Sequence, residues 1–167
     1  IWKAKKSLTK NNPSSYKYSP VPIEPGFYLD TRLAASLFVY EDGLSQNTFS
    51  FNVGPTLILG DFKKPYFDYT KIYVSAGVIV KQGSSPFAFD DAIDLGTIGL
   101  GLVQQVAGPL VLKTDLQMNV DSSSKYYGKV INSLFELQWK RRAYDLGLFY
   151  SPYEGVGGIK IRLNDFN

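Results

Sequence analysis

The sequence predicts an all-β protein with the fold of an antiparallel, transmembrane-type β-barrel or part of one, built from about eight long amphipathic strands. The first observation is that apolar and polar residues alternate with a period close to two from Phe27 onward. The second is that the alternating segments are about twice as long as the roughly 5–6 residues of an average soluble strand. The third is that the connections between them alternate in length.

Eight segments carry this alternation, and each places apolar side chains on one face and polar side chains on the other. The fifth segment is the clearest, because Leu112 and Leu116 alternate with Asp115 and its polar neighbours. The sixth departs from the pattern at Leu134. The predicted strands cover residues 27–41, 47–60, 69–82, 95–107, 109–121, 130–140, 143–151 and 157–166.

Alternation by itself also fits a soluble sandwich or a lipocalin-like barrel. The polar face of the fifth segment is too polar for a packed core, since burying Lys113, Asp115 and Gln117 in succession would cost free energy. The strand lengths suit a bilayer, which a tilted strand crosses in about 9–11 residues. No run of about 18 apolar residues that would predict a transmembrane helix occurs.

The connections indicate which end of the sheet is which. Short links are predicted at 60–64, 108–109 and 141–142, and longer ones at 83–94 and 122–129. The short links all fall at one end of the sheet, as the periplasmic turns of outer-membrane barrels do. The sequence therefore predicts an outer-membrane protein with its C-terminus in the periplasm.

Aromatic residues gather near the predicted strand ends, as in the interfacial girdles of membrane barrels. The alternative is the ordinary preference of Tyr and Phe for strands. These residues are Phe27, Tyr28, Tyr40, Phe62, Tyr66, Phe67, Tyr69, Tyr126, Tyr127, Trp139, Tyr144 and Tyr150.

Composition argues against several classes of function. The chain has neither Cys nor His, so it lacks the usual general base, thiolate ligands and disulfides. No catalytic constellation is evident, and we expect no enzyme activity, no cofactor and no metal. The net charge of +3 is scattered, which argues against nucleic-acid binding. Residues 1–26 are rich in Lys, Asn and Pro and predict an irregular arm or connector, or else a frayed terminus, before the barrel region at 27–167.

Several longer motifs carry a resemblance to a known family. They are PYFDYT at 65–70, KQGSSPF at 81–87, GLVQQ at 101–105, GPL at 108–110, WKRR at 139–142, Tyr144, SPY at 151–153 and GGIKIRLNDFN at 157–167. Over roughly 27–167 the chain resembles the C-terminal part of the cyanobacterial LptD-like outer-membrane family. The resemblance implies a role in lipopolysaccharide transport and assembly, with outer-membrane lipid, lipopolysaccharide and periplasmic lipopolysaccharide-bridge proteins as partners.

The sequence departs from that family in three respects. It is too short to form a large barrel alone, it shows no periplasmic bridge domain, and it lacks the cysteines of the enteric relatives. We therefore expect either the C-terminal portion of a larger barrel or a shortened relative.

Six charged residues are predicted to line the polar face, where they would contact anionic sugar-phosphate headgroups as a substrate site. The alternative, which we favour, is that they pair with one another across neighbouring strands. They are Lys113, Asp115, Glu136, Asp145, Lys160 and Arg162. Arg141 and Arg142 are instead predicted to be membrane-surface anchors at a periplasmic turn.

The last predicted strand resembles the signal that the barrel-assembly machinery reads, an alternating apolar strand that ends in an aromatic residue. Ile159, Ile161 and Leu163 supply the alternation, and Phe166 lies one residue from the end. The alternative is one more amphipathic strand without a signalling role.

Four functions remain open on the sequence. The first is a lipopolysaccharide-export component, and the second is a small outer-membrane pore or structural barrel that closes with its own eight strands. The third is a lipid-modifying enzyme, which the lack of His and of any Ser- or Asp-centred cluster argues against. The fourth is a soluble lipocalin-like binder. A second protein layer over the apolar face would rule out the membrane assignment.

Overall fold

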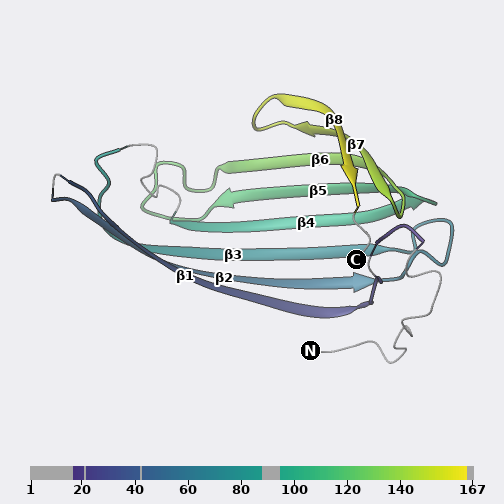
Figure 1. Cartoon of the computed structure of the whole chain (residues 1–167), viewed down its shortest axis with the longest axis horizontal. Coiled ribbons are helices and arrows are strands. Elements are labelled where there is room, and N and C mark those ends of the chain that lie inside the picture. Colours follow the sequence, from purple (N-terminus) through teal and green to yellow (C-terminus); the bar gives the residue numbers. More distant parts are fainter. Residues whose placement is uncertain (1–16, 21, 42, 88–94, 165–167) are drawn as a thin grey trace.

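The computed structural model describes residues 17–20, 22–41, 43–87 and 95–164. These residues form eight strands in one sheet of order β1 to β8, in which each strand is antiparallel to the next (Figure 1). The strands are β1 Gly26–Val39, β2 Ser45–Leu59, β3 Thr70–Gly83, β4 Gly96–Ala107, β5 Leu110–Asn119, β6 Val130–Lys140, β7 Tyr144–Ser151 and β8 Val156–Leu163. The predicted all-β, antiparallel, eight-stranded architecture is confirmed, and each strand end lies within about three residues of its predicted position.

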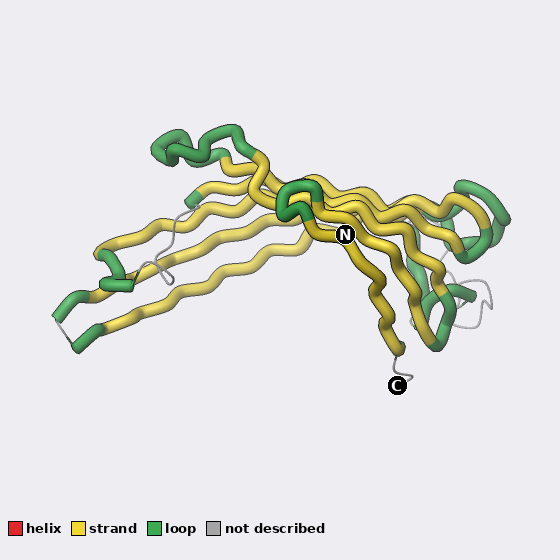
Figure 2. Tube along the Cα trace, turned by 90° about the horizontal axis from the view of Figure 1, so that it is seen from above, coloured by secondary structure: helices red, strands yellow, loops and turns green. Residues whose placement is uncertain are grey.

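The sheet is strongly bent and open (Figure 2). Its edge strands are β1 and β8, which do not pair with each other. Because the number of strands is even, the two edges run in opposite directions. The sheet in the described chain is therefore a trough and not a closed barrel.

One face of the trough, which we call the apolar face, has no protein layer over it within the described residues. Leu33, Phe51 and Val78 lie side by side on this face, across β1, β2 and β3. They are exposed, Leu33 to 65% of its surface, and Leu100 in the middle of β4 is exposed to 52%. The apolar strips that the alternation predicts are thus present, but nothing in the described chain packs against them.

The connections at one end of the sheet differ from the prediction in one place. The link between β2 and β3 spans residues 60–69 instead of a tight turn at 60–64. The carboxylate of Asp68 folds this link, because its Oδ2 accepts hydrogen bonds from the backbone N–H of Lys63 at 2.8 Å and of Asp61 at 3.4 Å. Phe62 has a left-handed φ of 63°, a conformation that is unfavourable for a residue with a side chain. Burial of its aromatic ring offsets this free-energy cost. We call this the short-turn end, since the links at 108–109 and 141–143 are tight.

A small buried cluster lies at the short-turn end, on the polar side of the sheet. Its aromatic rings are in contact, with Phe62 stacked on Tyr69 at 4.6 Å and edge-on to Tyr18 at 5.2 Å between ring centroids. Val111 of β5 is fully buried beneath them, and Val103 and Ile23 pack at the margin. Burial raises the pKa of Tyr69 to about 12. Through Tyr18 and Ile23 the cluster packs the predicted arm against the sheet.

Gln105 at the end of β4 holds this corner together and is fully buried. Its Oε1 accepts hydrogen bonds from the backbone N–H groups of Asp68 and Tyr69 at 3.0 and 3.2 Å. Its Nε2 donates to the carbonyls of Lys64 and Gly108 at 3.2 and 3.0 Å. One side chain therefore satisfies the backbone of two links that are far apart in the sequence.

We predict that Gln105→Leu lowers the free energy of unfolding by about 3 kcal/mol, because two backbone N–H groups lose their buried acceptor. The measurement is urea unfolding of the full chain in lipid vesicles, followed by circular dichroism. Gln117→Leu is the control, since Gln117 lies on the same face and makes no side-chain hydrogen bond within the described residues. A loss no larger than that of the control would contradict the role given to Gln105.

Candidate functional site

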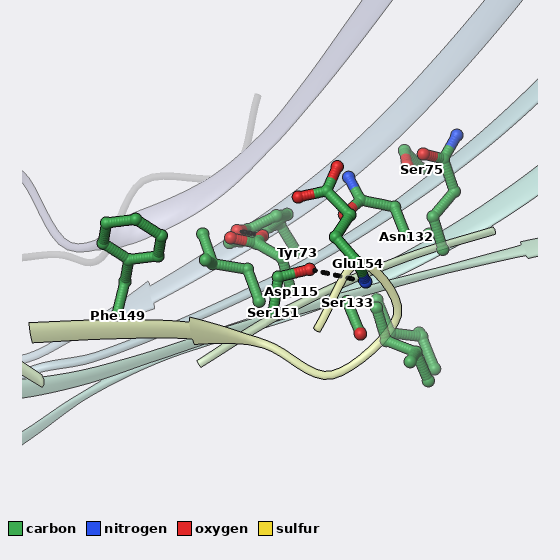
Figure 3. A pocket seen from close by; sticks show the side chains of 13 residues that line it. Tyr73, Ser75, Asp115, Asn132, Ser133, Phe149, Ser151 and Glu154 are labelled. Atoms are coloured by element: carbon green, nitrogen blue, oxygen red, sulfur yellow. Dashed lines mark hydrogen bonds between the residues drawn. The ribbon is translucent and has the colours of Figure 1, made fainter. Parts of the chain in front are cut away.

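The polar face lies on the inside of the bend and is hollowed. One hollow of about 630 Å³ is lined by residues from β1 to β6, among them Arg32, Asn52 and Gln117, and by Glu154 of the β7–β8 turn. Since strands so far apart in the sheet face the same space, the polar face is concave. A second hollow of about 310 Å³ lies beside it (Figure 3).

The six predicted charged residues share this polar face and lie together on β5 to β8. In the strand register Lys113 is opposite Glu136, and Asp145 is opposite Arg162. Ion pairs join Lys113 to Asp115 at 2.8 Å, Lys160 to Glu136 at 4.0 Å, and Lys140 to Asp145 at 3.9 Å. Lys113 and Asp115 pair within β5, and Lys160 and Glu136 pair between β8 and β6. The pair between neighbouring strands is that of Lys140 with Asp145, and Lys140 is not one of the six predicted residues. Together with Lys140 the group has four cationic and three anionic side chains, an excess of one positive charge.

Gly147 allows the longest of these pairs to form. Lys160 of β8 lies opposite Gly147 of β7, and the carboxylate of Glu136 reaches over that glycine from β6. A Cβ at Gly147 would lie 2.6 Å from Oε1 of Glu136, so the Glu136 carboxylate would have to move from its present position. Glu136 is only 3% exposed, and a buried carboxylate is stabilised by a cationic partner. The missing side chain thus makes room for the ion pair.

Gly101 lies between Tyr73 and Asp115, two residues that line the hollow of about 310 Å³, and the sequence did not predict that these two meet. Tyr73, Gly101 and Asp115 lie in one row across β3, β4 and β5. The ring of Tyr73 lies over Gly101, where a Cβ would collide with it, and its hydroxyl donates a hydrogen bond to Oδ1 of Asp115. The alternation places Tyr73 on the polar face, but only the strand register shows that it meets Asp115.

The other wall of this hollow comes from the C-terminal hairpin. Phe149 and Ser151 of β7 and Glu154 of the following turn project toward it (Figure 3). The hydroxyl of Ser151 accepts a hydrogen bond from the backbone N–H of Glu154 at 3.4 Å, which keeps the turn close to the sheet. Hydroxyl, amide and carboxylate groups therefore line this hollow together with apolar side chains such as Leu134 and Phe149.

The apolar face of β8 carries the predicted assembly signal. Ile159, Ile161 and Leu163 lie on that face, opposite Leu148, Leu146 and Tyr144 of β7. Phe166 lies outside the described residues. Arg141 and Arg142 are at the β6–β7 turn, as predicted, and the Arg141 guanidinium lies 5.1 Å from the centre of the Trp139 ring.

The described residues lack two other kinds of feature. They contain no group of three or more carboxylate, His or Cys side chains that could hold a metal ion. They also contain no helix long and apolar enough to cross a membrane.

The fold and the polar face define a protein made of a single amphipathic antiparallel sheet. The chain belongs to a family described as protein of unknown function (DUF3769), whose model matches residues 1–167. No curated protein and no solved structure matches it.

We predict that Gly101→Val destabilises the protein by about 1–3 kcal/mol, because the new side chain displaces the Tyr73 ring from Asp115. Gly54→Val is the matched control, since a Cβ there would meet its nearest neighbour at an ordinary 3.4 Å. The measurement is urea unfolding in lipid vesicles. Tyr73→Phe should lower stability in the wild-type chain but not in the Gly101→Val chain; equal losses in both backgrounds would show that Gly101 does not position Tyr73.

Proposed function

We propose that this protein is an outer-membrane β-barrel component of the LptD-like type that takes part in lipopolysaccharide transport and assembly. The observation that carries the proposal is the apolar face, which is exposed along the sheet and has no protein layer over it in the described chain. Soluble proteins rarely expose contiguous apolar patches larger than a few hundred Å². Hydrocarbon is the solvent in which such a face is stable.

The strand lengths support the same placement. β1, β2 and β3 have 14, 15 and 14 residues, and a tilted strand needs about 9–11 residues to cross a bilayer. β7 and β8 have eight residues each, slightly fewer than this length. In this proposal the open edges at β1 and β8 are completed by barrel closure, either with further strands or with each other, because an unpaired edge is costly in lipid.

The lipopolysaccharide role rests on the polar face and on the resemblance to the LptD-like family. A concave surface with hydroxyl, amide and charged side chains suits a sugar-phosphate headgroup, while the apolar face suits its acyl chains. Lys113, Lys160 and Arg162 supply cationic donors for phosphate. Lys113 already pairs with Asp115 and Lys160 with Glu136, so a headgroup would have to replace these ion pairs.

We predict that Leu100→Arg costs about 2–4 kcal/mol of folding stability in a bilayer, since Leu100 lies in the middle of the apolar face. The control Gln117→Arg, on the polar face, should change stability by no more than about 0.5 kcal/mol. Both are measured by urea unfolding of the protein reconstituted in vesicles. If both arginines have the same small effect, the apolar face does not contact hydrocarbon.

For the transport role, we predict that depletion of the full-length protein in its host lowers the amount of lipopolysaccharide at the cell surface. The reason is that the export route ends at this component. Surface lipopolysaccharide is measured by labelling intact cells, with total lipopolysaccharide in lysed cells as the control. Unchanged surface levels would reject the transport role without rejecting the membrane placement.

A small pore is the second candidate, and the eight-stranded trough itself favours it. Eight strands are enough to close a narrow barrel, and antiparallel edges are compatible with pairing between β1 and β8. The hollow of about 630 Å³ on the polar face would then lie in the lumen. We predict discrete conductance steps from residues 1–167 in planar bilayers if the sheet closes on itself, whereas silent bilayers would reject the pore.

A further inference from the structure

The apolar face has its own hollow, which the proposed function leaves without a role. Two rows of side chains border it: Trp139, Leu146 and Ile161 form one row across β6, β7 and β8, and Leu137, Leu148 and Ile159 form the next. The hollow is about 420 Å³ and is lined almost wholly by carbon. Ile159 is 74% exposed at its rim. A groove of this size and lining is suited to an acyl chain.

A cationic group lies at the end of this groove. Trp139 is in the row nearest the short-turn end, and the strand leads from it through Lys140 directly into the β6–β7 turn. The guanidinium of Arg141 lies over the Trp139 ring, 5.1 Å from its centre. Arg141 makes no ion pair with any carboxylate in the described part of the chain. The apolar groove is therefore followed by Trp139 and then by Arg141, whose guanidinium N–H groups can donate hydrogen bonds to a ligand.

This order of groups matches the order of groups in a phospholipid. Tryptophan prefers the level of the lipid headgroups, where one side of the ring is apolar and the other is wet. A guanidinium recognises a phosphate through two parallel hydrogen bonds. The groove would hold an acyl chain, and Arg141 would meet the phosphate at the depth where the lipid places it.

We propose that the groove on β5 to β8 and the guanidinium of Arg141 together form a binding site for one anionic phospholipid. The lipid lies with an acyl chain in the groove and its phosphate on Arg141. The site rests on the proposed placement in the outer membrane, and it extends that placement from general solvation by hydrocarbon to selection of one lipid class. It lies on the apolar face, opposite the charged group that would contact lipopolysaccharide.

Trp139 is a built-in reporter of the site. The chain has two tryptophans, so Trp2→Phe leaves Trp139 as the single one. The full chain with this change is reconstituted in phosphatidylcholine vesicles, and flotation measures how much protein is bound. Trp139 fluorescence is then compared between vesicles that contain brominated phosphatidylglycerol and vesicles that contain the same fraction of brominated phosphatidylcholine, each normalised to unbrominated lipid.

We expect phosphatidylglycerol to quench Trp139 with about fivefold higher apparent affinity than phosphatidylcholine, the preference that one basic side chain at a membrane surface gives. Arg141→Gln should reduce the ratio to near one, and Arg141→Lys should keep most of it. Lys64→Gln is the matched control, because Lys64 is an exposed cation at the same end of the sheet but away from the groove. It should leave the ratio unchanged.

Three other outcomes distinguish failure of the phospholipid site from failure of the membrane placement. Protein that floats with the vesicles but is quenched equally by both lipids would overturn the anionic site and leave the placement standing. Protein that floats but is quenched by neither would show that another surface, such as a second copy of the chain, covers the groove. Protein that does not float would overturn the membrane placement itself.

Discussion

The whole structure depends on one constraint, the in-register antiparallel ladder that keeps every apolar side chain on the same face. Leu33, Phe51 and Val78 form a continuous row only because three strands keep this register. A slip of one residue in any strand would turn its apolar side chains to the polar face. The ladder also satisfies the backbone polar groups inside the sheet, so a single layer is sufficient where the surroundings supply the apolar contact.

The two faces are stabilised by different means. On the polar face, Gly101 and Gly147 leave space for long side chains to cross a neighbouring strand, so that Tyr73 reaches Asp115 and Glu136 reaches Lys160. The only buried apolar cluster in the described chain is at the short-turn end, where Phe62 is held by neighbouring rings. The apolar face has no such internal partner. Its stability must come from outside the described chain, and this is the physical basis for the proposed membrane placement.

The proposed activities divide between the faces. Transport of a sugar-phosphate headgroup would use the concave polar face, where three ion pairs join charged side chains of β5 to β8. Selection of a phospholipid would use the groove on the opposite face, where Arg141 lies beside Trp139. These sites share strands β5 to β8 but no side chain, so each is open to substitution without direct damage to the other.

The sequence by itself determined the strands and which side chains lie on each face of the sheet, because a period of two is a local property of the extended chain. It also placed six charged residues together on the polar face. Only the tertiary structure decided which of those residues meet. The Gln105 network joins residues 36 and 37 positions apart, and the 60–69 link follows from hydrogen bonds of Asp68 that no periodicity encodes. The register shift between β5 and β6 at Gln117 and Met118 lies close to Leu134, where the alternation fails. The sequence also could not predict that β1 and β8 do not pair with each other, because closure of the sheet depends on the summed twist and bend of eight strands.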